Sequence, residues 1–330
     1  MTSPLLEVDG LETRFHTDEG VVAAVDDISF TVDRGEIVCL VGETGSGKTA
    51  ACESITRLVP DATIDGSIRF DGRELTTCSS AAIRRLRGDR IAHVFQQPSS
   101  SLDPVYTVGE QIVEAVRLHR DVSRSAARER AVSLLDRVGI AAPRDRLDSY
   151  PHELSGGMRQ RVAIAIALAA DPELLIADEP TTALDVTVQA GVLELLRDLQ
   201  REHDLAVLLV THDLGVVAEL ADRVVILYAG RVMERGPVGS VFDEPAHPYT
   251  TRLFDAAKGI EDDVDATAVA PNDDGCPFLS ECPYAVDDCS DGDIAFHDLE
   301  NGTPPTDRHE VACIHYSSAY DSEVLRGDRL

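Results

Sequence analysis

A glycine-rich stretch near the N-terminus has the residue types and the spacing that bind phosphate. It reads Gly42-Glu43-Thr44-Gly45-Ser46-Gly47-Lys48-Thr49 and satisfies G-x-x-x-x-G-K-[ST]. Residues 36–41 before it form an apolar run that predicts a buried strand, and residues 50–58 predict a helix. This order directs backbone N–H groups toward one anion. Lys48 would then reach the phosphates of a nucleotide and Thr49 would bind Mg²⁺, the alternative being a chance glycine-rich turn.

Polar residues follow three further predicted strands. The apolar strand predicted over residues 173–180 ends in two carboxylates, Asp178 and Glu179, and adjacent strand residues point to opposite faces. One carboxylate can therefore bind a metal ion while the other activates water, unless both are simply solvated. Gln96 follows a strand at 91–95, and His212 follows one at 205–210. Alone, Gln96 is more often a loop residue, and a lone histidine such as His212 is usually structural or solvated.

Between residues 99 and 168 the apolar period becomes helical, which predicts an inserted helical subdomain. Near its end, Ser155 is a good N-cap, and Gly156 and Gly157 expose the N–H groups that follow. This is a second helix start able to bind an anion, the alternative being a capped helix without a ligand. Upstream, Phe15 can stack on a base or serve as an ordinary core aromatic.

Charge and length narrow the class of protein. The formal net charge is −29 over 330 residues, and only Lys48 and Lys258 among the 30 basic residues are lysines. Such acidity opposes nucleic acid as a partner. It favours the cytoplasm of a halophile, where salt screens self-repulsion, over a moderately acidic bacterial protein. The longest apolar run, residues 162–170, is too short to cross a bilayer, and residues 1–10 lack a secretory signal. We therefore expect a soluble protein that contacts membranes through a partner.

The last part of the chain has a different composition. Residues 260–274 are acidic and polar, which predicts a linker. Four cysteines follow, namely Cys276, Cys282, Cys289 and Cys313. Disulfides are disfavoured in a cytosolic chain, and so many thiols in a segment poor in apolar residues suggest a metal centre. The spacing is neither that of a zinc ribbon nor that of common ferredoxins.

The order of these motifs over residues 5–258 resembles the nucleotide-binding subunit of an ABC transporter, and the Ser-Gly-Gly signature is its most specific part. The resemblance implies an α/β fold. It comprises a P-loop ATPase with a RecA-like core, an antiparallel β subdomain and an inserted helical subdomain at about 99–168. The nucleotide-binding domain would cover residues 1–258, and a C-terminal extension with a four-cysteine metal site would cover residues 259–330.

The resemblance also implies roles for individual residues. Glu179 would be the general base and His212 would contact the γ-phosphate, with Lys48 and Gln96 joining them in catalysis. Thr49, Gln96 and Asp178 would surround Mg²⁺. The residues implied to bind ATP are Phe15 (with His16 as a weaker candidate), Gly42, Glu43, Thr44, Gly45, Ser46, Gly47, Lys48, Thr49, Ser155, Gly156, Gly157 and Asp185. The signature loop of one subunit would close on the ATP of a second, with Asp185 at the seam.

Further stretches resemble one branch of this family. Met158 stands where the commonest sequence has Gln, and peptide importers share this feature. Residues 95–104 and 245–250 resemble oligopeptide, dipeptide and nickel importers. The segments around Cys276, Cys282 and Cys313 resemble the extension that carries a [4Fe–4S] cluster in some members, with zinc or a metal-free tail as alternatives.

The implied assembly has several partners. They are a second ATPase subunit, expected to be a paralogue, two membrane permease subunits and an extracellular substrate-binding protein. The complex would lie at the cytoplasmic face of the cell membrane, in a halophilic archaeon. The competing hypotheses are a nickel or sugar importer, a soluble ABC ATPase of DNA repair or translation, and a redox-sensing regulator that uses the tail metal as its switch.

Overall fold

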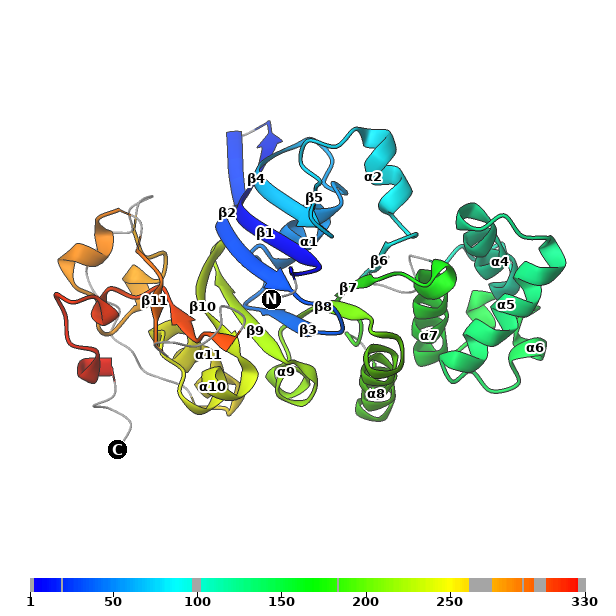
Figure 1. Ribbon diagram of the computed structural model, residues 1–330. Helices are drawn as coiled ribbons and strands as arrows, with labels where there is room; N and C mark the ends of the chain where they lie inside the picture. The colour runs from blue at the N-terminus through cyan, green and yellow to red at the C-terminus, as the bar shows by residue number, and fades with distance from the viewer. Residues whose placement is uncertain are drawn as a thin grey trace.

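The computed structural model describes residues 3–18, 20–96, 102–182, 184–260, 275–292, 294–299 and 307–325. In this part of the chain two β-sheets are stacked, with helices on the outer face of the larger one. A helical bundle lies on one side of the sheets and a small C-terminal extension on the other (Figure 1). The predicted α/β class is confirmed.

The smaller sheet is antiparallel, with the order β2-β1-β4-β5. Its strands are β1 (Leu6–Thr17), β2 (Gly20–Val32), β4 (Ala62–Phe70) and β5 (Arg73–Glu74). β1 is one long strand whose register with β4 shifts between Asp9 and Glu12. β4 and β5 are joined by a tight hairpin turn at Asp71 and Gly72, whose φ values of 51° and 72° such a turn requires.

The larger sheet has the order β11-β12-β10-β9-β3-β8-β7-β6. Its strands are β3 (Ile37–Val41), β6 (Ile91–Val94), β7 (Leu174–Asp178), β8 (Ala206–Thr211), β9 (Arg223–Tyr228), β10 (Arg231–Pro237), β11 (His297–Asp298) and β12 (Glu310–Val311). The strands from β9 to β6 run parallel, and β3, β7 and β8 are buried along their whole length. Their continuous apolar runs fit strands covered on both faces.

The two faces of β3 belong to different parts of the core. Ile37, Cys39 and Val41 join the cluster that contains α8 (Val186–His203) and α9 (Leu214–Leu220). Val38 and Leu40 join the cluster that contains the smaller sheet, α1 (Lys48–Ile55) and α2 (Ser80–Leu86). The larger sheet is therefore the middle layer, and its carboxyl edge is held rigidly from both sides.

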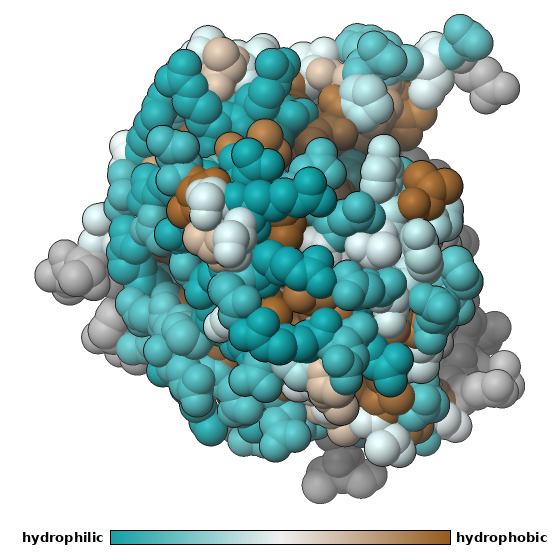
Figure 2. All heavy atoms as spheres, turned by 90° about the vertical axis from the view of Figure 1, so that its right-hand side faces the viewer, coloured by the Kyte–Doolittle hydropathy of each residue, from teal (hydrophilic) through white to brown (hydrophobic). Residues whose placement is uncertain are grey.

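The predicted helical insert is present in the described part of its range. Its helices are α4 (Val108–His119), α5 (Arg124–Arg137), α6 (Pro143–Arg146), η1 (Pro151–Glu153), α7 (Gly156–Ala167) and η2 (Leu168–Ala170). Thr107 and Glu110 form a capping box at the start of α4, and Ser123 caps α5. Residues 102–168 contain no strand, and residues 97–101 lie outside the described residues. The outer face of the bundle is mostly hydrophilic with separate hydrophobic patches (Figure 2).

The C-terminal extension continues the larger sheet. Its elements are α10 (Val238–Asp243), α11 (Pro248–Ala257), η3 (Leu279–Glu281), η4 (Asp287–Ser290), β11, β12, η6 (Ile314–Tyr316) and η7 (Ser322–Leu325). β12 pairs with β10, so the boundary predicted at residue 258 separates two parts that share a sheet. Residues 261–274, most of the predicted linker, lie outside the described residues. None of the described helices combines the length and apolarity needed to cross a bilayer.

Candidate active site

The phosphate-binding stretch forms the turn between β3 and the start of α1. No side chain in the described part of the chain caps α1, whose N-cap is Gly47 in a left-handed conformation. Its first N–H groups are therefore available to an anion. A Cβ on Gly42 would lie 2.2 Å from the Leu227 oxygen, and one on Gly47 would lie 2.3 Å from the Ala24 oxygen. Glycine is thus required by close backbone approach at both positions.

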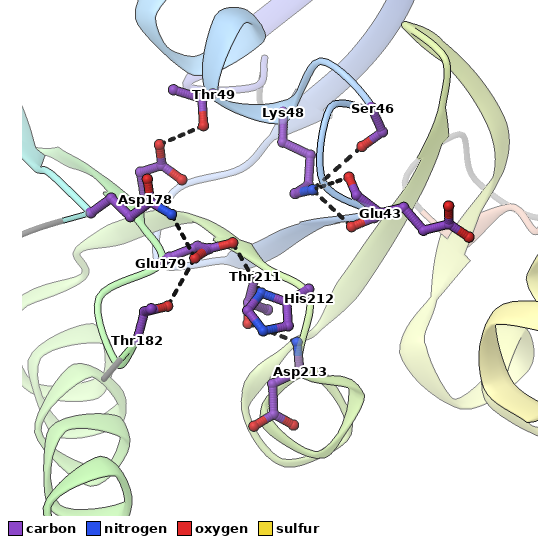
Figure 3. Close-up of polar contacts among 12 residues, drawn as sticks. Glu43, Ser46, Lys48, Thr49, Asp178, Glu179, Thr182, Thr211, His212 and Asp213 are labelled. Atoms are coloured by element: carbon purple, nitrogen blue, oxygen red, sulfur yellow. Dashed lines mark hydrogen bonds and ion pairs between the residues drawn. The ribbon is translucent and has the colours of Figure 1, made fainter. Parts of the chain in front are cut away.

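Lys48 is folded back onto this loop. Its Nζ donates to the carbonyl oxygens of Gly42 and Glu43, both at 2.7 Å, and to Ser46 Oγ at 3.4 Å (Figure 3). Burial lowers the pKa of Lys48, although nearby carboxylates oppose that shift. The ammonium lies at the mouth of the loop, where it can exchange its carbonyl partners for phosphate oxygens.

Thr49 and Asp178 meet beside the loop. Thr49 Oγ1 donates to Asp178 Oδ2 at 2.7 Å, whereas the buried Asp178 Oδ1 has no hydrogen-bond partner among the described residues. Burial raises the pKa of Asp178, which a cation at this carboxylate would reverse. A hydroxyl and an unsatisfied carboxylate oxygen are ligands that Mg²⁺ prefers, so these residues fit the predicted metal.

Glu179 is held by donors from three different segments. Gln96 Nε2 and Thr182 Oγ1 both donate to Oε2 at 2.8 Å, and His212 Nδ1 lies 3.0 Å from Oε1 (Figure 3). Burial alone would raise the pKa of Glu179, but these hydrogen bonds outweigh it and lower the pKa. The residue has φ of 44°, an uncommon conformation for a side chain other than glycine. The site therefore keeps an ionised carboxylate in a fixed direction.

The signature residues begin another pair of helices. Ser155 Oγ accepts the N–H of Met158 and caps α7, as predicted, and Asp185 caps α8 by accepting the N–H of Val188. A Cβ on Gly157 would lie 2.2 Å from Val188 Cγ1, so glycine lets these helix starts approach closely. Within the described residues, no hydrogen bond joins Ser155 or Gly156 to the phosphate loop.

Phe15 lies near the end of β1. It is half-buried, and its strand partners are Val22 and Ala62. Val21 and Val22 are more than half exposed, which leaves an apolar surface at this end of the hairpin. His16 is exposed and hydrogen-bonds Thr63 through Nε2. Phe15 thus has an apolar surround suited to stacking, and His16 is already engaged by a polar neighbour.

Sequence reasoning missed two hydroxyl groups of the site. Thr182 was not singled out, although it follows Glu179 within one turn and donates to its carboxylate. Tyr249 Oη accepts the N–H of Glu43 at 3.2 Å. The only available signal for Thr182 was its proximity to the strand-end acids, and Tyr249 had none, since it is 206 residues from Glu43.

The four tail cysteines are close enough to influence one another. Burial raises the pKa of Cys276 to about 11 and of Cys282 and Cys313 to about 12, and neighbouring thiolates add to these shifts. Burial likewise raises the pKa of Cys289. Four thiols have the donor chemistry of an iron–sulfur or zinc centre. Among the described residues, however, no three His, Cys, Asp or Glu side chains are arranged to hold a metal ion.

Two protein families match the chain. Residues 25–182 match the family "ABC transporter", and residues 233–289 match "Oligopeptide/dipeptide transporter, C-terminal region". The first match contains the phosphate loop, the signature and the strand-end acids. The second begins on β10 and ends at Cys289, so it includes the segment that carries Tyr249.

Several curated proteins are similar over most of this chain. A peptide import ATP-binding protein of Brucella abortus is 48% identical over 298 residues, which cover 87% of this chain and 90% of that protein. The oligopeptide transport ATP-binding protein OppD of Mycobacterium tuberculosis is 48% identical over 326 residues, which cover 94% of this chain and 52% of that longer protein. A dimeric structure of MJ0796, a bacterial ABC transporter cassette, superposes with a TM-score of 0.64 at 29% identity, covering 71% of this chain and 98% of that one.

Proposed function

The chain belongs to the ATP-binding proteins of ABC transporters, in the peptide-import branch, and from this premise we propose that it hydrolyses ATP to power peptide uptake across a membrane. The observation that carries the proposal is the Glu179 carboxylate, held by Gln96, Thr182 and His212 across from the Lys48 loop. The match of residues 233–289 to the oligopeptide/dipeptide C-terminal region supports peptides as the cargo class.

In this proposal the chain positions a triphosphate and a water molecule. The N–H groups at the start of α1 and the Lys48 ammonium bind the β- and γ-phosphates, and Phe15 stacks on the adenine. Mg²⁺, held by Thr49, Gln96 and Asp178, would neutralise charge on the transferred phosphoryl group.

The remaining polar groups act on the attacking water. Glu179 orients the water and accepts its proton, while His212 contacts the γ-phosphate. Gln96 is exposed and donates a hydrogen bond to Glu179. Because Gln96 is also a proposed Mg²⁺ ligand, it can couple the position of the metal ion to the orientation of the water at Glu179. Catalysis rests on positioning and electrostatics, as phosphoryl transfer requires.

A second ATPase subunit completes the site. Ser155, Gly156 and Gly157 lie at the start of α7, and no hydrogen bond among the described residues joins Ser155 or Gly156 to their own phosphate loop, so a partner's triphosphate is their proposed ligand. Asp185 would lie at the seam between the subunits, next to Val186, which is 82% exposed. We propose a paralogous partner, since peptide importers of this kind often use two different ATPase chains.

The membrane-facing surface is proposed on the helical insert. Phe95, Val105 and Tyr106 are exposed apolar side chains beside Gln96 and the start of α4, at 44%, 70% and 53% of their full area. Two permease subunits would dock here at the cytoplasmic face of the membrane, and an extracellular binding protein would deliver the cargo. Nickel or sugar uptake is the alternative cargo assignment.

Reconstitution tests this function. The chain should be assembled with its permeases and second ATPase in vesicles, and ATP hydrolysis measured with and without binding protein and peptide. Peptide-stimulated hydrolysis and uptake support the proposal. Stimulation by nickel or a sugar instead would reassign the cargo, and hydrolysis indifferent to permeases would favour a soluble ABC ATPase.

The tail metal and the source organism remain separate proposals. We propose that residues 259–330 form a distinct extension in which Cys276, Cys282, Cys289 and Cys313 bind a [4Fe–4S] cluster, with zinc as the alternative. Iron, sulfide and zinc analysis after anaerobic purification decides between them. A redox-regulatory role would be seen as an oxidant response lost in Cys→Ser variants that still transport.

The relatives described above are bacterial, so a halophilic archaeal source rests on the net charge of −29 alone and predicts loss of folding at low salt.

A further inference from the structure

The phosphate loop is hydrogen-bonded to the start of α11, which lies in the part of the chain that matches the oligopeptide/dipeptide C-terminal region. Tyr249 Oη accepts the N–H of Glu43 at 3.2 Å, and Tyr249 is completely buried. Glu43 is the second residue of the loop, inside the ABC transporter match, whereas Tyr249 lies in the oligopeptide/dipeptide match. The contact therefore joins the part of the chain that all ABC cassettes share to the part peculiar to this branch.

Tyr249 is placed by a buried network rather than by a mobile loop. Glu234 on β10 is fully buried and accepts the N–H groups of Ala246 and His247, both at 2.8 Å. His309 Nε2 lies 2.7 Å from the same carboxylate. His247 Nδ1 then accepts the N–H of Tyr249 and caps α11. The start of α11, and with it the Tyr249 ring, is fixed relative to the larger sheet.

The ring also contacts the extension directly. The centroids of Tyr249 and Phe278 are 5.5 Å apart, and those of Tyr249 and Tyr228 are 4.6 Å apart. Phe278 is buried in the segment between Cys276 and Cys282. The hydroxyl of Tyr228 points elsewhere, donating to Glu281 at 2.6 Å. The packing of Phe278 therefore affects the position of the Tyr249 ring. Through the Tyr249 hydroxyl it also affects the backbone of Glu43.

The backbone of Glu43 has few other restraints. Its carbonyl accepts Ser46 N–H at 3.2 Å and Lys48 Nζ at 2.7 Å, and its side chain is exposed. When Lys48 turns from this carbonyl toward a phosphate, one of those two bonds is lost. The bond to Tyr249 does not involve Lys48 and persists through the exchange.

We propose that Tyr249 is a positioning residue for nucleotide binding, through which the C-terminal extension fixes the shape of the phosphate loop. The inference rests on the proposed ATP-binding function and assigns this branch's extension a part in it. Because Tyr249 contacts no reacting atom, its hydroxyl governs how well the loop N–H groups match the phosphates. It does not govern how fast the bound triphosphate is cleaved.

The test uses the full-length chain and the matched pair Tyr249→Phe and Tyr228→Phe. Both variants lose one hydroxyl from the same aromatic cluster, but only the first loses a bond to the loop. We expect the Kd for MgADP and the KM for ATP to rise about tenfold in Tyr249→Phe, with kcat within about twofold. In Tyr228→Phe the Kd for MgADP, the KM for ATP and kcat should all stay within about twofold of the wild type.

Hydrogen exchange of the loop adds a readout in the wild type itself, which a folding defect of a variant cannot affect. In the nucleotide-free wild type the Glu43 amide should exchange more slowly than an unprotected amide, and Tyr249→Phe should abolish this protection. An unprotected wild-type amide, or equal nucleotide affinity of wild type and Tyr249→Phe, overturns the inference alone. Failure of the wild type to bind nucleotide overturns the proposed function instead.

Discussion

Replacing Glu179 by glutamine isolates the proposed base from the geometry that holds it. Glu179 Oε2 accepts Gln96 Nε2 and Thr182 Oγ1, and Oε1 faces His212 Nδ1. A glutamine oxygen at the Oε2 position keeps the first two bonds. Its NH₂ group then faces His212, whose Nδ1 accepts once the other ring nitrogen carries the proton. The substitution should therefore preserve folding and ATP binding.

The size of the kinetic effect follows from the lost charge. An amide has no basic lone pair for the proton of water, and general acid–base catalysis contributes about 10²–10⁴ in rate. We expect Glu179→Gln to lower kcat by at least about 100-fold while the Kd for ATP changes by less than about threefold. Bound ATP should then accumulate, and with it any dimer that closes on ATP.

Steady-state ATP hydrolysis, equilibrium binding and gel filtration with ATP measure these quantities. Glu194→Gln is the matched control, because Glu194 has an exposed side chain on α8 and belongs to none of the nucleotide or metal sites described above. It should hydrolyse ATP within about twofold of the wild type. Hydrolysis by Glu179→Gln within tenfold of the wild type would refute the assignment of the base.

Three further predictions follow from local geometry. Gly157→Ala places a Cβ against Val188 Cγ1 and should lower stability by about 1–3 kcal/mol, and adding Val188→Ala should restore most of the Tm, which thermal unfolding of both variants checks. Gln96→Ala removes one of the donors that lower the pKa of Glu179, so the acidic limb of kcat should move to higher pH, and a limb that stays in place contradicts the bond. Burial lowers the pKa of His247 to about 4, which means that the folded chain holds the neutral ring. The stability gained from burying the neutral ring is complete above the unfolded pKa of about 6.5 and is lost as pH falls toward 4. Denaturant unfolding across that range should show a flatter pH dependence in His247→Gln.

The sequence predicted those parts of the site that lie next to one another along the chain. The strand, glycine turn and helix of residues 36–58 depend on local pattern, and β3 and α1 follow it within three residues. Strand alternation predicted separate directions for Asp178 and Glu179, but β7 ends at Asp178 and Glu179 has φ of 44°, so the separate partners of the two carboxylates depend on this turn and not on alternation along a strand. Gln96 and His212 follow two parallel strands, and the carboxyl ends of parallel strands lie along one edge of the sheet.

Contacts between distant segments carried no such signal. β12 pairs with β10 over two residue pairs, Glu234 with Val311 and Arg235 with Glu310, and a two-residue strand has no readable period. The return of Lys48 onto two carbonyls depends on the folded loop, and the bond from Glu43 to Tyr249 spans 206 residues. The four cysteines, the scarcity of apolar residues around them and the family resemblance predicted a metal centre, but the arrangement of the sulfur atoms is a property of packing that spacing does not specify.

The charges of the described site bear on the proposal that two chains close on each nucleotide. The Lys48 ammonium is opposed by the carboxylates of Asp178 and Glu179, so the site is net negative before a triphosphate enters. In a chain of net charge −29 the surroundings do not reverse that balance. In the proposed function the compensating positive potential would come from Mg²⁺ at Thr49 and Asp178, from the uncapped start of α1, and from a second helix N-terminus. Ser155 caps the N-terminus of α7, and no hydrogen bond among the described residues joins it to its own phosphate loop, which agrees with the proposal that the α7 N-terminus serves the nucleotide of a second chain.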